Sequence, residues 1–327
     1  MVPRSTFGFA VAATLAATLL LSSQGNAAEV TLRAVSAFPL NTQFGKPFKA
    51  FVDEVNKRGQ GILKINLLGG PETMPAAEDA NAVHNGVVDI AWTPPNYYAN
   101  LLPEASAMAF TDVSPASLRK NGGWDFLEEL HAKKVNAYLL NAFGWGIKHH
   151  LYLVKPVKSL ADIKGLKIRP APGMQDFFAA LGASNVSMMP GEVYTGLERH
   201  VIDGYSWPLW GVNDLGWSRV TKQRLDPGYG GVQVNSIINL DKWKKLTPAQ
   251  RKFLNDMRTW FDDYAAKTIA ATNEAEAKKQ AAAGIAVLKL SDADAKRMTD
   301  AFSTTMWAAM KKQAPDDADK LKSYLVQ

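Results

Sequence analysis

The sequence predicts an α/β protein of two lobes, each built on a sheet with helices packed on its faces, and a long helix that bridges both lobes. Strand-like and helix-like segments alternate along most of the chain, as they do in α/β proteins. About 300 residues remain after a removable leader, which is more than one core usually serves. One amphipathic segment near the C-terminal end is also too long for a single lobe.

The first 28 residues have the order of a secretory signal peptide. One cation, Arg4, precedes an apolar stretch from Phe7 to Leu21, and small residues follow up to Ala27 and Ala28. The apolar stretch is short for a membrane span, and small side chains suit the peptidase that removes such leaders. We expect export to the periplasm with cleavage near Ala27 or Ala28. An uncleaved membrane anchor is the alternative.

Hydrophobic periodicity, caps and glycine breaks predict the elements in order. In the first half they are strands over 30–37, 62–68, 87–92 and 136–143, and helices over 44–56, 75–85 and 118–134. In the second half they are a capped turn at 159–162, a strand over 166–169, helices over 172–181 and 190–200, a strand over 285–290 and a helix that starts at Ser291.

The longest predicted element is a helix over 248–283. Thr247 is suited to cap it and Pro248 to begin it, and no breaker occurs before Gly284. At 1.5 Å per residue this helix would be about 54 Å long, which exceeds the diameter of one lobe. It must therefore bridge both lobes.

The composition excludes several classes of function. Cys is absent, so disulfides, thiolate metal sites and thiol catalysis are excluded. Lys and Arg number 37 against 31 Asp and Glu, or 36 against 31 without Arg4, and these charges are dispersed along the chain. Because nucleic-acid binding needs a clustered basic stripe, no nucleic-acid partner is expected.

Motifs of catalysis and cofactor binding are also missing. The sequence contains no Gly-x-Ser-x-Gly, His-Glu-x-x-His, P-loop or dinucleotide glycine pattern, and it contains five His residues. His149 and His150 are adjacent on a predicted strand and point to opposite faces, so they cannot share one metal without distortion. We therefore expect no catalytic residue, metal or cofactor.

Arg169 is a candidate ligand-binding residue. It ends a predicted strand and precedes Pro170, and open α/β sheets bind ligands at such strand ends. The planar donor fork of Arg suits a carboxylate. The alternative role for Arg169 is a surface salt bridge. Trp207 is a further candidate for ligand contact, and its alternative is a position in the core.

Several motifs together resemble those of the substrate-binding proteins of tripartite ATP-independent periplasmic (TRAP) transporters, a dicarboxylate-binding-protein-like family. They are KGLKIRP at 164–170, LGA at 181–183, MP at 189–190, EVY at 192–194, VIDG at 201–204, NGVVDIA at 85–91 and LPEA at 102–105. The resemblance implies a two-lobed periplasmic binding protein with a mixed sheet in each lobe. It also implies a non-catalytic receptor that delivers a small carboxylate ligand to the membrane permease subunits of a TRAP transporter.

In the family, the Arg that ends the Gly-Leu-Lys-Ile-Arg segment pairs with the ligand carboxylate, and that position here is Arg169. Sialic-acid-type members carry a second Arg where this chain has His149, and an Asn where it has Trp207. Members that bind keto acids through a cation have Glu-Trp where this chain has Ser206 and Trp207. The Ser in place of Glu argues against a metal ion between ligand and protein. The His and Trp in place of Arg and Asn indicate a pocket less polar than that of a sugar-acid receptor.

The resemblance also places Phe38 and Trp92 beside the same cleft. The combined prediction is a monocarboxylate with an apolar or aromatic body. Its charge is expected on Arg169, and its body among Phe38, Trp92 and Trp207, with His149 nearby.

We expect lobe I to comprise 29–150 and about 233–272, and lobe II to comprise 151–232 and about 273–327, with crossings near His150 and Val232. A monomer is expected. Two alternatives stay open. One is a solute-binding protein of an ATP-driven importer, and the other is an exported hydrolase or isomerase that uses Glu192, His149 or His200.

Overall fold

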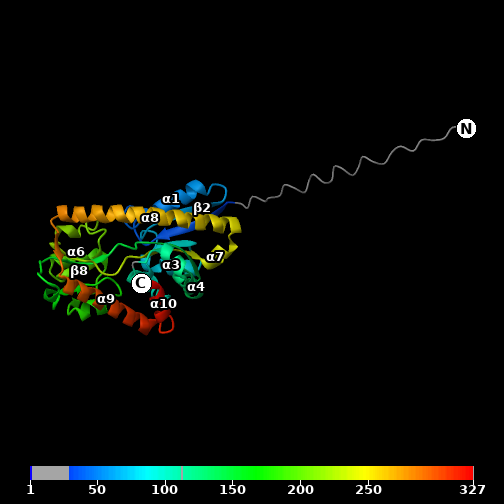
Figure 1. Cartoon of the computed structure of the whole chain (residues 1–327). Coiled ribbons are helices and arrows are strands. Elements are labelled where there is room, and N and C mark those ends of the chain that lie inside the picture. The colour runs from blue at the N-terminus through cyan, green and yellow to red at the C-terminus, as the bar shows by residue number, and fades with distance from the viewer. Residues whose placement is uncertain (2–28, 112, 327) are drawn as a thin grey trace.

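The computed structural model describes residue 1 and residues 29–111 and 113–326, so the predicted signal peptide lies outside the described part of the chain. Two mixed sheets form the centres of two lobes, and helix α8 runs along both, as Figure 1 shows. The predicted fold class is confirmed. Of the helices in the described ranges, none is long and apolar enough to cross a membrane.

Lobe I contains a five-stranded sheet in the order β2-β1-β3-β10-β4. Its strands are β1 (Val30–Ser36), β2 (Leu63–Gly69), β3 (Ile90–Thr93), β4 (Ala137–Phe143) and β10 (Val234–Asn239). β1 is parallel to β2 and β3, whereas β10 is antiparallel to β3 and β4. Every residue of β4 is buried, because helices cover both faces of the sheet, and this explains why its sequence is continuously apolar.

The two faces of this sheet carry separate apolar clusters. On one face, Phe48 and Phe51 of α1 pack with Phe261 of α8. On the other face, Leu127 of α4 and Met108 of the 3-10 segment η3 belong to a second cluster. The elements of this lobe are α1 (Lys46–Arg58), η1 (Ala76–Glu78), α2 (Asp79–His84), η2 (Pro95–Tyr98), η3 (Pro103–Phe110), α3 (Pro115–Asn121), α4 (Gly123–Val135) and α7 (Leu240–Lys245).

Two predicted helices of lobe I differ from the structure. The segment predicted as one helix over 118–134 is divided into α3 and α4 at Gly122, whose φ of 86° is left-handed and ends α3. Glycine adopts this conformation without steric cost. The segment 75–85 begins as a 3-10 turn, and it is α-helical only from Asp79.

Lobe II contains a six-stranded sheet in the order β11-β9-β5-β8-β6-β7. Its strands are β5 (His149–Leu153), β6 (Lys167–Arg169), β7 (Ser184–Asn185), β8 (Gly204–Pro208), β9 (Gln223–Asp226) and β11 (Ala286–Lys289), and its helical segments are η4 (Leu160–Ile163), α5 (Gln175–Ala180), α6 (Pro190–Glu198) and η5 (Trp217–Arg219). The predicted capping box of Ser159 and Asp162 is present at η4. β6 is parallel to β8, and β5 is antiparallel to it.

Helix α8 (Pro248–Ala282) contacts both lobes. The hydroxyl of Thr247 accepts from the backbone N–H of Gln250 and so caps the helix as predicted. Near the start, Leu254 is buried in the core of lobe I. Near the end, the side chain of Gln280 donates to the Tyr152 hydroxyl of lobe II at 3.1 Å. The prediction that this helix bridges the lobes is therefore correct.

The C-terminal helices depart from the predicted division into lobes. α9 (Asp292–Gln313) begins against lobe II, where Phe302 is buried. Its later residue Trp307 and the following helix α10 (Ala318–Leu325) pack in the core of lobe I. The prediction places 307–325 in lobe II, because helical spacing shows that a helix is amphipathic but not which core its apolar face joins. α9 is thus a second helix that bridges the lobes (Figure 1).

We expect Phe302→Ala to lower the free energy of unfolding by about 3–5 kcal/mol, which is usual for a large-to-small change in a core. The Phe302 ring is 5% exposed, and its centroid lies 5.4 Å from that of Phe177 and 6.2 Å from that of Phe110. Chemical denaturation measures the change. Thr304→Ala, on the exposed side of the same helix, is the control and should change stability by less than about 0.5 kcal/mol.

Candidate ligand-binding site

A cavity of about 900 Å³ is lined by segments from both sheets and from α9. Most of its wall is apolar. The side chains that form this apolar wall include Phe38, Phe44, Pro75, Pro95, Phe110, Met174, Met188, Met189, Trp207, Val232, Val234, Met306 and Met310. A concave and mostly apolar site with few polar groups is typical of small-molecule binding.

Arg169 brings a cation into this cavity. It is the last residue of β6, and the following Pro170 lacks the N–H that a further hydrogen bond of the sheet would need. The side chain is only 3% exposed. Its Nε donates to the Met188 carbonyl at 3.2 Å, and its guanidinium lies 5.6 Å from the centre of the Trp207 ring. Nη1 is buried without a hydrogen-bond partner among the described residues.

The charge of Arg169 has no acidic counterpart in the cavity. Of the described side chains that line it, only Arg169 carries a formal charge at neutral pH, since its lining includes no Asp, Glu or Lys. Burial lowers the pKa of Arg169, and Tyr97 acts in the opposite direction. Arg remains protonated in proteins despite such shifts. The site therefore presents one cation in an apolar surrounding.

Trp207 lies beside Arg169. β8 pairs with β6 so that Arg169 is opposite Tyr205, and Trp207 projects from the same face two residues later. The indole Nε1 donates to the Trp210 carbonyl at 3.1 Å. Since its only donor is engaged, Trp207 can offer a ligand its ring face but no hydrogen bond.

His149 also lines the cavity, at the start of β5. Burial, His150 and Arg169, in that order, lower the pKa of His149 to about 3, although a hydrogen bond with the backbone of Gly231 acts in the opposite direction. The ring is therefore neutral at physiological pH.

His150 is separated from this site by strand alternation. Its Nδ1 lies 2.9 Å from Oδ1 of Asp226. Burial raises the pKa of Asp226, but His150 and Arg224 outweigh that effect and hold the pKa at about 2. Among the described residues, no group of three His, Cys, Asp or Glu side chains is arranged to hold a metal ion.

Phe38 lies at the cavity and Trp92 does not. Phe38 follows β1, lines the wall, and packs against Phe44 with ring centroids 5.3 Å apart. Trp92 is 0% exposed, stacks on Phe48, and donates from Nε1 to the Phe44 carbonyl at 2.8 Å. The expected ligand contact of Trp92 is corrected to a core position, because its side chain points to the face of the sheet that α1 and α8 cover.

Sequence reasoning missed several lining residues. Tyr97 of η2 is close enough to Arg169 for their charges to affect one another. The backbone carbonyl of Met188 accepts a hydrogen bond from Arg169. Any residue type could provide this carbonyl, so the sequence cannot predict the contact. Met306 and Met310 lie one helical turn apart on α9, a spacing that predicts an apolar face but not its position beside a cavity.

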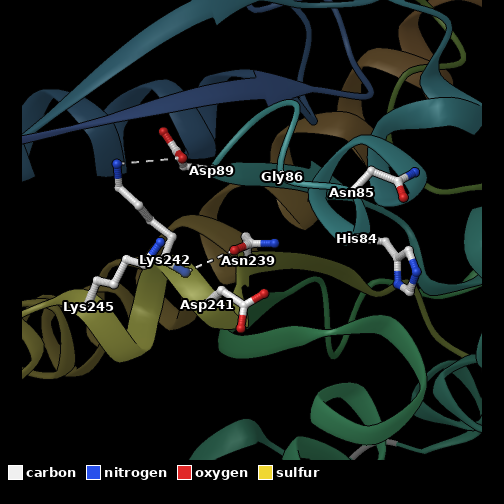
Figure 2. Close-up of a pocket in the computed structure, with 8 residues that line it drawn as sticks. All are labelled: His84, Asn85, Gly86, Asp89, Asn239, Asp241, Lys242 and Lys245. Atoms are coloured by element: carbon white, nitrogen blue, oxygen red, sulfur yellow. Dashed lines mark hydrogen bonds and ion pairs between the residues drawn. The ribbon is translucent and has the colours of Figure 1, made fainter.

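A second, smaller pocket of about 320 Å³ lies on lobe I and shares no lining residue with the cavity. Figure 2 shows its polar side chains, among them Asp89, Asn239 and Lys242. The side chains of Asp89, Asn239 and Lys242 are paired with one another or with neighbours. The Asn239 side-chain oxygen accepts from the Lys242 N–H, and the Lys242 ammonium lies 3.8 Å from Asp89. The ion pair links the residue that precedes β3 to α7.

The family model of bacterial extracellular solute-binding proteins, family 7, matches residues 35–313. The chain belongs to this family. Family-7 members are TRAP-type solute receptors rather than enzymes. The suggested resemblance is thereby confirmed.

Individual relatives of this family-7 receptor cover most of its length. The 2,3-diketo-L-gulonate-binding periplasmic protein YiaO of Escherichia coli is 29% identical over 84% of this chain and 85% of its own. The monocarboxylate 2-oxoacid-binding periplasmic protein all3028 of Nostoc is 27% identical over 74% of this chain and 71% of its own. A Desulfovibrio salexigens TRAP protein with bound orotic acid has a TM-score of 0.79 at 19% identity, covering 90% of this chain and 97% of its own. A Bordetella pertussis receptor that binds pyroglutamic acid has a TM-score of 0.77 at 20% identity, covering 91% of this chain and all of its own.

A buried polar network holds the η2 segment at the cavity wall of this receptor. The Tyr98 hydroxyl lies 3.0 Å from Nε2 of His131 and accepts from the Asn235 amide at 2.8 Å. Nδ1 of His131 lies 2.6 Å from the Leu127 carbonyl. The ring thus donates to the carbonyl and accepts from Tyr98. Burial lowers the pKa of His131 to about 4, so the ring is neutral.

We expect the free energy of unfolding to fall as the pH is lowered from 7 to 5. The folded-state pKa of His131 lies below the 6.5 of an unfolded His, so its stabilisation is fully present above pH 6.5 and is lost as the pH falls toward 4. The loss at pH 5 should be about 2 kcal/mol. Chemical denaturation at both pH values should give a smaller fall for His131→Phe than for the wild type. If the free energy of unfolding fell equally in the variant and the wild type, groups other than His131 would cause the pH dependence.

Proposed function

We propose that the chain is exported, with its signal peptide cleaved near Ala27 or Ala28, and works as a monomeric receptor in the periplasm. It binds a monocarboxylate with an apolar or aromatic body, and it delivers this ligand to the permease subunits of a TRAP transporter. The family match does not favour the alternatives of an ATP-driven importer or an exported enzyme.

The observation that carries this proposal is the single cation of the cavity. Arg169 is nearly fully buried, and its Nη1 has no hydrogen-bond partner in the described part of the chain. One carboxylate would neutralise the guanidinium through charge-assisted hydrogen bonds. A second carboxylate on the ligand would meet no other cation, and a buried unpaired charge costs several kcal/mol. A singly charged acid therefore fits better than a dicarboxylate.

The wall chemistry supports an apolar body. Phe38, Trp207 and Met188 all line the cavity. Aromatic and thioether side chains bind apolar groups without offering strong hydrogen bonds. No Asp or Glu lines the cavity among the described residues, so a ligand ammonium group would have no counter-ion.

The names of relatives support a carboxylate. The Nostoc relative is named for a monocarboxylate 2-oxoacid, and the two structural neighbours hold orotic acid and pyroglutamic acid. At these identities, the solved structures show a common fold rather than a common ligand, so the choice of ligand for this chain rests on its own residues.

We expect monocarboxylates with an apolar body to raise the melting temperature of the mature protein. At about 100 times the dissociation constant, binding should add about 2.7 kcal/mol and shift the transition by about 5 °C or more. A thermal-shift screen would compare 4-methylpentanoate and 3-phenylpropionate with succinate and sialic acid. Stabilisation by the last two alone would contradict the proposed ligand class.

We expect Arg169→Ala to weaken binding of the best monocarboxylate by about 30-fold or more, since it removes one partner of a buried charge pair. Isothermal titration calorimetry measures the affinity. The control is Arg219→Ala, which removes an exposed cation from the same lobe. Because solvent and salt screen an exposed charge, this variant should keep the affinity within about twofold of the wild type. An unchanged affinity in Arg169→Ala would exclude Arg169 as the anchor.

A further inference from the structure

The cavity continues beyond Arg169 to a stretch of wall that the proposed anchor does not use. The end of η3 and the second half of α9 form this stretch. The backbone N–H of Gly231, which also lines the cavity, donates to the Ala109 carbonyl at 2.8 Å and so ties the stretch to the crossing before β10. We call it the α9 wall and define it by the residues Ala109, Phe110, Met306, Ala309 and Met310.

The residues of α9 that reach the cavity lie on one face of the helix. Met306, Ala309, Met310 and Gln313 all line the cavity, and residues at this spacing share one helical face. At 1.5 Å per residue, the face extends over about 10 Å, or about two helical turns. Its side chains are apolar except for the last one, Gln313. The cavity is thus bordered by an apolar stripe.

The protein itself does not fully cover the α9 wall. Ala109, Phe110 and Ala309 are half-buried, whereas Met108 of η3, which belongs to the core of lobe I, is fully buried. The methyl side chains at positions 109 and 309 fill little space, so they leave room for a ligand group. Removal of apolar surface from water is favourable, so an apolar ligand group would gain by covering this wall.

The anchor and the α9 wall lie on different sides of the cavity. Trp207, beside Arg169, donates to the Trp210 carbonyl at 3.1 Å, and the Trp210 indole donates to Asn273 of α8 at 2.7 Å. These contacts put Arg169 toward the α8 side. α8 and α9 run along opposite sides of the molecule (Figure 1). A ligand held at Arg169 therefore has to extend across the cavity to reach α9.

The cavity wall stays apolar between these two sides. Ala171 and Met174, which follow Arg169 in the chain, line the cavity and belong to the same apolar cluster as Met306. The cavity volume of about 900 Å³ is near the upper end of the range of about 300–1,000 Å³ for pockets that bury drug-sized ligands. A six-carbon acid is much smaller than such a ligand. Held at Arg169, it would leave the α9 wall in contact with water.

We propose that the ligand is an elongated monocarboxylate, whose carboxylate binds Arg169 and whose apolar chain of about eight carbons or more extends to the α9 wall. This inference rests on the proposed function and deepens it, because it adds a length to the ligand class. A short body would leave the stripe of α9 in water. A second charge at the far end of the chain would meet an apolar wall, where an unpaired charge is costly.

The test compares butanoate, hexanoate, octanoate and decanoate by calorimetry on the mature wild-type protein. Each CH₂ group that the cavity buries should tighten binding about threefold to fourfold. Octanoate should therefore bind about 10-fold more tightly than hexanoate, because its additional carbons reach the α9 wall. An affinity that levels off or falls beyond hexanoate would overturn the inference.

Substitutions that fill the space at the α9 wall assign the length preference to it. Ala309→Phe should weaken binding of octanoate and decanoate about 10-fold or more, since overpacking is costly, and should leave butanoate within about twofold of the wild type. Ala109→Leu fills the same space from η3 and should give the same dependence on chain length. The matched control is Ala308→Phe, on the exposed side of α9 and outside the cavity lining, which should leave the affinity for all four acids within about twofold.

The pattern of loss separates the α9 wall from the anchor. Arg169→Ala should weaken all four acids by a similar factor, because each acid has the same carboxylate. An equal loss for short and long acids in Ala309→Phe, or no loss for the long acids in either wall variant, would overturn the role of the α9 wall. Thermal melts establish that each variant folds.

Two outcomes with the wild type distinguish this inference from the proposed function. If the wild type bound none of the four acids but did bind a dicarboxylate, the proposed ligand class itself would fail. If it bound butanoate and hexanoate but rejected the longer acids, the proposed function would stand and only the extension to the α9 wall would fail.

Discussion

The cavity is organised around a buried cation, Arg169, that has no acidic partner among the described residues that line it. Transfer of a charge from water into a protein costs several kcal/mol unless hydrogen bonds and counter-charges compensate. Arg169 has partial compensation, from the Met188 carbonyl and the face of Trp207. An acidic neighbour would stabilise the guanidinium further, but it would compete with any anionic ligand. Its Nη1, which has no partner among the described residues, is the group to which we assign the proposed anionic ligand.

The two sheets and the two bridging helices determine where this cation lies. β6 ends at Arg169, and Pro170 turns the chain away, so the guanidinium reaches the cavity rather than the sheet. The first part of α8 packs in the core of lobe I, and Gln280 near its end donates a hydrogen bond to the Tyr152 hydroxyl of lobe II. α9 contributes to both cores and places Met306 and Met310 in the cavity wall. The cavity wall is therefore shared among segments that are distant in sequence.

The sequence was informative where local chemistry decides the structure. The cap at Thr247, the capping box at Ser159 and the alternation of strands and helices are local properties, and the structure contains them. Arg169 could be placed at a cavity because strand ends bind ligands in α/β sheets. Trp92 could not be distinguished from Phe38 in this way, because both aromatic residues lie at or just after a strand end, and only the packing of α1 and α8 decides which of the two is covered.

Long-range packing accounts for the other differences. The apolar face of α9 is visible in the sequence, yet its division between two cores depends on where the chain turns after Gln313. The neutral state of His149 follows from burial and from Arg169, which is 20 residues away in sequence. The hydrogen bond from Arg169 to Met188 uses a backbone carbonyl, which every residue possesses.

The return of α9 and α10 to lobe I has a consequence for how such a receptor can be divided or recombined. Lobe I is assembled from the N-terminal segment, from β10 with the first part of α8, and from the C-terminal helices. No single cut in the gene therefore yields a complete lobe. To graft the cavity of one receptor onto another, several separate segments would have to be exchanged together, including the stretch of α9 that lines the cavity.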